Sequence, residues 1–266
     1  MNYKQLSLIM IFWNLSNLLI NLSLKFTSVS ISTILSSTST IFTLILSKSL
    51  GFETFNFIKI ISTMLSFIGI TLVSITDDDY DDQQPILPFK QRFPLIGNSF
   101  ALLSALSFSI YLIFLKLFIP NHHNFNFSSF LGYIGFLNLT CTWPFLLLLH
   151  YSKIERLELP NDFDSLFYIL GNMLITFSSD YLYIKALLKT TPFIATISLS
   201  LSLPFSIVID ILFGNPSLPV KALIGSFFIL ISFTAVGYTD DDHSNNLKID
   251  ENENTENENT ENENPN

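Results

Sequence analysis

Long runs of apolar residues, without the polar face of an amphipathic helix, follow one another along most of this chain. A hydrocarbon core about 30 Å thick needs about 20 helical residues, each rising about 1.5 Å. Helices or strands of a soluble core would show a polar face at their own period, and these runs mostly do not. The pattern predicts eight membrane-spanning helices, near residues 5–24, 29–48, 56–76, 95–119, 128–150, 164–184, 192–213 and 219–239.

The composition agrees with an all-α fold, a polytopic transmembrane helical bundle whose main surroundings are the lipid bilayer. Hydrophobic residues make up 49% of the chain and 27 residues are Phe. Charged residues make up 13%, against about 25% in soluble domains. With eight spans, both ends lie on the same side of the membrane. Lys and Arg are divided almost equally between the two sides, so the positive-inside rule does not say which side that is.

The net charge of −9 comes from the end of the chain. Residues 240–266 are rich in Asp and Glu and contain one base, Lys248, so the rest of the chain is formally neutral. This acidic, low-complexity segment is predicted to be a disordered tail. Residues 77–94 are predicted to form an acidic loop.

A weak internal repeat relates residues 13–37 to residues 177–201, shifted by 164 positions. Its most specific identities are Lys25 with Lys189 and Thr27 with Thr191. The repeat pairs the first span with the sixth, and this odd offset makes the two copies inverted, a common design of secondary transporters. Residues 1–76 are then an incomplete first repeat of three spans, and residues 95–239 a second repeat of five. The first copy looks as though it lacks two leading helices.

Polar side chains at helical spacing mark one face of the first span. Asn14, Asn17, Asn21 and Lys25 follow each other by three or four residues, so they share a face. Unsatisfied amides are costly in hydrocarbon, so this face must meet other helices or a wet cavity. The pattern leaves both open. The repeat partners of these residues are Ser178, Tyr181, Lys185 and Lys189.

Hydroxyl groups are dense in the second span and in its repeat partner, the seventh. They include Ser36 and Thr40 in the second span and Ser200 in the seventh, where Pro204 can also kink the helix. Such residues suit a helix that lines a pathway, and close helix packing explains them equally well. Asp180 and Asp210 lie within spans, where an ionisable side chain suggests a function. Alternatively, they reach toward the headgroups or pair with a neighbouring helix.

Other kinds of chemistry find little support in the sequence. It contains no nucleophile elbow, phosphate-binding loop, dinucleotide loop or zinc-protease helix. No basic patch supports nucleic-acid binding. The single cysteine, Cys141, excludes a disulfide or a cysteine metal site within the chain. We therefore expect no catalytic residues, no metal and no cofactor, and a protein that is not an enzyme.

Four stretches, residues 35–46, 97–116, 130–160 and 178–210, resemble the drug/metabolite transporter superfamily. Within it, the chain is most similar to the EamA-like solute carrier family 35, subgroup F. The resemblance implies ten helices in two inverted five-helix repeats, with the eight spans here matching helices 3–10. It also implies an endomembrane location, vacuolar or Golgi rather than the plasma membrane. Relatives outside the subgroup move nucleotide sugars.

Together these observations predict a transporter of a small polar solute, possibly anionic and like a nucleotide sugar, that works by alternating access. Its predicted site contains Lys185 as the positive charge and Asp180 as the group that neutralises Lys185 when the site is empty. The other predicted site residues are Asn14, Asn17, Asn21, Ser36, Thr40, Ser178, Tyr181 and Ser200. The alternatives are a non-transporting scaffold or receptor, or an inactive truncated carrier. Pairing of two chains as a homodimer is also left open.

Overall fold

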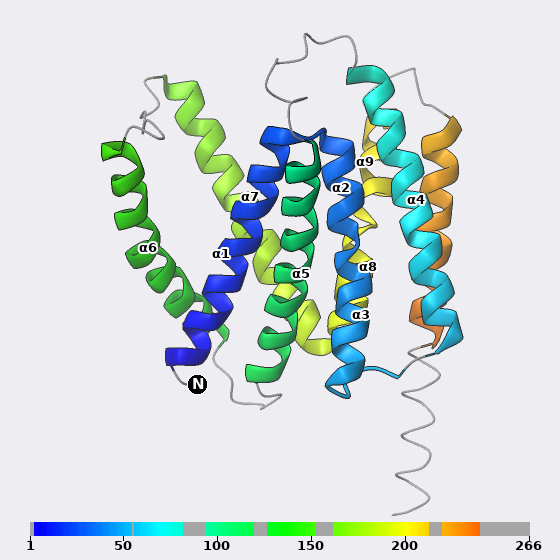
Figure 1. Ribbon diagram of the computed structural model, residues 1–266, viewed down its shortest axis with the longest axis horizontal. Coiled ribbons are helices and arrows are strands. Elements are labelled where there is room, and N and C mark those ends of the chain that lie inside the picture. Colours follow the sequence, from blue (N-terminus) through cyan, green and yellow to red (C-terminus); the bar gives the residue numbers. More distant parts are fainter. Residues whose placement is uncertain are drawn as a thin grey trace, which may run out of the picture.

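The computed structural model describes residues 3–54, 56–81, 94–119, 127–152, 162–212 and 220–239. In these ranges the chain forms helices and no strand. The helices are α1 (Tyr3–Phe26), α2 (Val29–Ser37), α3 (Ser39–Ser49), α4 (Phe57–Asp81), α5 (Pro94–Phe118), α6 (Phe127–Tyr151), α7 (Phe163–Lys189), α8 (Pro192–Leu199) and α9 (Ser202–Leu212), followed by a helix over Val220–Thr239. They stand side by side as a bundle (Figure 1). The predicted tail 240–266 lies outside the described residues.

Seven of the described helical segments are long and apolar enough to cross a membrane. They include Val29–Ser49 and Pro192–Ile209, each of which combines two consecutive helices. The remaining predicted span, 164–184, corresponds to α7, which has 27 residues but a less continuous apolar stretch. Its interior contains Asp180 and Lys185, which lower its mean hydropathy. The all-α, multi-pass bundle is confirmed, and the described residues form a helix or a broken helix at each of the eight predicted spans.

The acidic segment after the third span begins as helix. We predicted a loop from residue 77, but α4 continues to Asp81. Residues 82–93 of the predicted loop lie outside the described residues.

Both composite spans are broken near their middle. In the first, Thr38 separates α2 from α3, and in the second Ser200 and Leu201 separate α8 from α9. Side-chain hydroxyls at each break donate to carbonyls three residues earlier: Ser36 to Thr33 O (3.0 Å), Ser37 to Ile34 O (2.7 Å), Thr38 to Leu35 O (2.6 Å) and Ser198 to Ala195 O (2.8 Å). These bonds compete with the regular helical ladder.

Pro204 adds a second cause to the break between α8 and α9. Proline has no N–H to donate to the carbonyl four residues earlier, which here belongs to Ser200. Leu203 N donates to that carbonyl instead, at 3.2 Å, as a tighter turn would. The expectation that Pro204 disturbs its helix is confirmed, and the disturbance falls one turn before it.

The order of elements is the same in both copies of the predicted repeat. A long helix, a broken helix and a further long helix follow each other as α1, α2–α3 and α4, and again as α7, α8–α9 and Val220–Thr239. The two series run in opposite directions, because α1 starts at the end of the bundle where the N-terminus lies and α7 starts at the other end (Figure 1). Helix α5 lies between the series and contacts α1, α2, α3 and α8.

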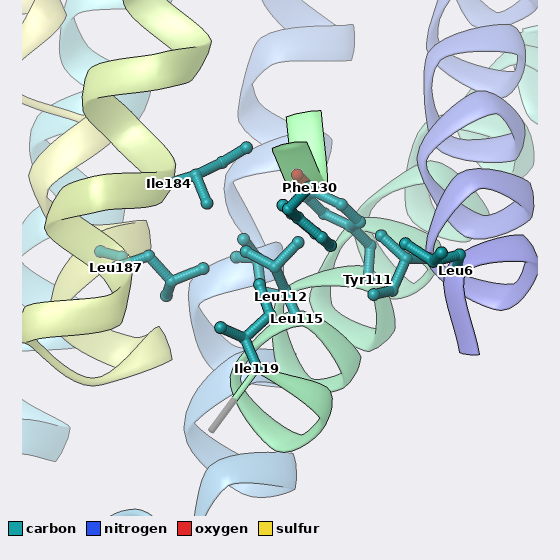
Figure 2. Packing of buried hydrophobic residues seen from close by; sticks show 10 residues of the cluster. Leu6, Tyr111, Leu112, Leu115, Ile119, Phe130, Ile184 and Leu187 are labelled. Carbon is teal, nitrogen blue, oxygen red and sulfur yellow. The ribbon is translucent and has the colours of Figure 1, made fainter. Parts of the chain in front are cut away.

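The largest apolar cluster surrounds α5. Leu112 and Leu115 of α5, with Ile119 directly after it, lie between Leu6 of α1 and Leu187 of α7 (Figure 2). Leu112 and Leu115 are fully buried. The packing therefore fixes α5 as the helix through which the two series contact each other on this side of the bundle.

Two glycines allow α4 and the helix Val220–Thr239 to approach each other closely. A Cβ built on Gly69 would lie 2.6 Å from Gly225 O, and one built on Gly225 would lie 2.6 Å from Gly69 O. The relation is reciprocal, since each glycine also meets a side chain one turn after the other, Ile229 or Val73. Only hydrogen fits at either position, so these two glycines set the distance between the helices.

Candidate functional site

A cavity of about 300 Å³ lies where the two broken helices meet. Its walls come from both repeats and from α5. The polar residues that line it are Ser16, Thr33, Ser36, Ser37, Ser39, Thr40, Ser104, Thr196, Ser200 and Ser202. The apolar lining residues include Ile70 and Phe108. We call this space the central cavity.

Several hydroxyls of the central cavity are fixed by bonds between helices. Ser104 Oγ of α5 donates to Ser16 O of α1 at 2.9 Å, and Ser16 Oγ donates to Ser104 O at 3.2 Å. Ser200 Oγ lies 3.3 Å from Ser66 Oγ of α4. These contacts hold α1 against α5, and α8 against α4, around a lining of hydroxyl groups without a charged side chain. Such a lining suits hydrogen bonding to a polar, uncharged part of a ligand.

Three predicted site residues lie at the central cavity. Ser36 is near the end of α2, Thr40 is in the first turn of α3, and Ser200 follows α8, so all three flank the two breaks. The two breaks therefore bring residues of both composite spans to one cavity.

The three asparagines of α1 do not line the central cavity. Asn14 Nδ2 donates to Asn138 Oδ1 of α6 at 3.0 Å. Asn17 Nδ2 donates to Trp13 O at 2.9 Å, and Asn21 Nδ2 to Asn17 O at 2.7 Å. The amides are therefore satisfied by a neighbouring helix or by their own helix, which is the alternative that the sequence left open.

The predicted residues of α7 lie elsewhere. Ser178 and Tyr181 line a second cavity, of about 710 Å³, between α6 and α7. The Nζ of Lys185 donates to Tyr181 Oη at 3.2 Å and lies 5.1 Å from the centre of the Tyr181 ring. Asp180 is half-buried on the same helix. In the part of the chain that the structure describes, the ion pair joins Lys59 to Glu53, not Lys185 to Asp180.

The ten predicted residues therefore separate into the central cavity, the α1 face and the α7 face. Sequence reasoning missed Ser16, Ser39 and Ser104. A serine is compatible with any span because its hydroxyl can bond within its own helix, so no local signal identified them. It also missed the contact of Glu53 with Lys59. Six positions separate these residues, but the segment between α3 and α4 is not helical, so helical spacing could not predict their contact.

Comparison with known proteins agrees with this architecture. The family described as "EamA-like transporter family" matches residues 2–75 and 95–238, most of the chain. The chain belongs to the EamA-like transporter family. The first matched segment is about half as long as the second. This result confirms the resemblance to the drug/metabolite transporter superfamily.

Individual relatives are transporters or membrane proteins. The "Thiamine-repressible mitochondrial transport protein THI74" of Saccharomyces cerevisiae is 36% identical over 229 residues, 86% of this chain and 60% of the relative. An "Uncharacterized vacuolar membrane protein" of the same yeast is 33% identical over 237 residues, 87% of the chain and 60% of the relative. "Solute carrier family 35 member F5" of Mus musculus is 30% identical over 227 residues, 84% of the chain and 42% of the relative.

The family model shows membership of the EamA-like transporters, and the similarity to solute carrier family 35 member F5 supports the resemblance to subgroup F. The chain spans about 60% of the length of the first two yeast relatives. It is an integral, multi-pass membrane protein, and its vacuolar relative supports an internal membrane rather than the plasma membrane.

Proposed function

We propose that this EamA-like protein transports a small polar organic solute across an internal membrane by alternating access. The observation that carries the proposal is the central cavity, which lies where two oppositely directed broken helices meet. Broken helices at the interface of inverted repeats are a recurrent place for substrate binding in secondary transporters. Family membership and transporter relatives support the same function.

The breaks supply binding groups that regular helices do not. A helix interruption leaves N–H and carbonyl groups of the backbone available inside the bundle. Here side-chain hydroxyls satisfy part of the freed carbonyls. A solute rich in hydroxyl or carbonyl groups can exchange hydrogen bonds with both the side chains and the backbone. The volume of about 300 Å³ lies at the small end of ligand pockets and favours a small solute or one part of a larger one.

An uptake experiment tests the central cavity. Ser200→Phe places a large side chain in the cavity and is expected to lower the rate of solute uptake into vesicles about tenfold or more. The matched control is Ser206→Phe on α9, because Ser206 is exposed and its hydroxyl bonds back to Leu203 O. Uptake that falls equally in both variants would show that a bulky residue anywhere on α8–α9 disturbs the protein. Unchanged uptake with Ser200→Phe would exclude the cavity as the path.

The anionic class of the solute depends on Lys185. We propose that its ammonium group, beside the second cavity, attracts a negatively charged part of the solute, as in a nucleotide sugar. Lys185→Ala is then expected to raise the KM for an anionic solute about tenfold while changing that for a neutral one little. Lys185→Arg, which keeps the charge, is the control. Equal uptake by wild type and Lys185→Ala would remove Lys185 from the site and favour an uncharged solute.

A further inference from the structure

Two opposite charges are buried together at the end of the bundle where the N-terminus lies. Glu53 follows α3 and is 7% exposed, and Lys59 in the first turn of α4 is 2% exposed. Lys59 Nζ donates to Glu53 Oε2 and forms an ion pair with it. Buried charges are tolerated only when paired and hydrogen-bonded, so this pair holds the start of α4 against the segment after α3.

The same carboxylate also joins the two series of helices. Thr191 Oγ1 donates to Glu53 Oε1, across a separation of 138 positions in the chain. Thr191 is the N-cap residue of α8, and its hydroxyl accepts from Ile194 N at 3.4 Å. Glu53 therefore ties the turn between α3 and α4 to the turn between α7 and α8.

A second cation strengthens the second of these turns. Lys116, near the end of α5, donates to Leu188 O at 2.9 Å and to Thr190 O at 2.6 Å. These carbonyls are at the C-terminus of α7, where helical carbonyls lack partners and favour a positive charge. The chain between α7 and α8 is thus fixed from both sides, by Glu53 and by Lys116.

The opposite end of the bundle also has a threonine at the position that corresponds to Thr191. The repeat relates Thr191 to Thr27, which lies between α1 and α2. Thr27 is buried, yet within the described ranges its hydroxyl has no hydrogen-bond partner.

We propose that Glu53, Lys59 and Thr191 form a latch that closes the N-terminal end of the path to the central cavity. The proposal rests on the alternating-access function proposed above. Thr196 of α8 lines the central cavity and lies five residues after Thr191, between the latch and the break. When the series separate at this end, the bond from Thr191 to Glu53 must break. The attraction between Lys59 and Glu53 is strong while water is excluded from the pair. Water that enters when the series separate weakens this attraction, so the closed and open forms are two discrete states.

Cysteine labelling tests the latch. In a Cys141→Ser background, Thr196→Cys reports on the path, and a membrane-impermeant thiol reagent is added to vesicles on the side of the N-terminus. Thr191→Val removes the donor to Glu53 and is expected to raise the labelling rate about tenfold, as a shift of population toward the open form would. Thr191→Ser keeps the hydroxyl and is expected to label like the parent.

A second variant tests the latch in case Thr191→Val does not fold. Glu53→Gln with Lys59→Gln removes both buried charges but keeps groups that can hydrogen-bond, and it is expected to raise labelling as Thr191→Val does. Labelling within about twofold of the parent in a folded Thr191→Val or double variant would overturn the latch. The labelling reaction needs no solute. If the variants label faster but the wild type takes up no solute, the transport function alone is overturned. Uptake without a labelling response would overturn the latch alone.

Discussion

Gly225→Val is expected to destabilise the protein by about 3 kcal/mol, at the upper end of the usual cost of overpacking. The cause is the crossing of α4 and Val220–Thr239, where a Cβ on Gly225 would lie 2.6 Å from the backbone oxygen of Gly69. A backbone atom cannot move aside by a change of rotamer, so the helices themselves must separate. The same contact predicts a similar loss for Gly69→Val, because the relation is reciprocal.

The matched control lies in the same helix. A Cβ on Gly237 would meet nothing within 4 Å, so Gly237→Val carries the cost of the new residue in a helix without the clash. Thermal unfolding of purified protein in detergent, followed by tryptophan fluorescence, measures the difference. Equal loss of thermal stability in Gly225→Val and Gly237→Val would show that the two helices do not cross closely.

Lys59→Met is expected to cost about 3–5 kcal/mol of stability, since it leaves the buried Glu53 carboxylate without its cationic partner. Thr191 remains as a neutral donor to Glu53, but a hydroxyl does not balance the charge. The expected result is a lower midpoint of thermal unfolding and a lower yield of folded protein.

Removing the second charge should reverse most of this loss. The double variant Glu53→Leu with Lys59→Met contains no buried charge, and a buried ion pair replaced by apolar residues is often neutral in stability. Lys4→Met, at an exposed lysine of α1 on the same side of the bundle, is the control and should change stability by no more than about 0.5 kcal/mol. Additive losses in the double variant would show that the two charges do not stabilise each other.

The helical segments could be predicted from the sequence because hydrocarbon imposes one requirement on every residue of a span. Backbone groups without water must bond within their own helix, and about 20 apolar residues fulfil that requirement. The segment 95–119 is an example, since the structure shows α5 over Pro94–Phe118. Helix α7 departs from the pattern because Asp180 and Lys185 interrupt its apolar sequence.

The candidate site was predicted only in part. Ser36, Thr40 and Ser200 were found because hydroxyls concentrate in the two spans related by the repeat, and they line the central cavity. The stripe of Asn14, Asn17 and Asn21 is equally regular, but Asn14 bonds to Asn138 of α6 and the others to their own helix. Helical spacing places residues on one face and does not say what that face meets. The proposed role of these asparagines in binding stays a prediction.

By itself, the sequence determined that this protein is a multi-pass helical membrane protein with two hydroxyl-rich spans, because apolar length and residue spacing are properties of the chain alone. Only the tertiary structure decided that the breaks beside Thr38 and Ser200 enclose one cavity, that Gly69 touches Gly225, and that Glu53 binds both Lys59 and Thr191. The bond from Thr191 to Glu53 joins residues 138 positions apart. These contacts depend on how whole helices pack against one another, which no local pattern of residues encodes.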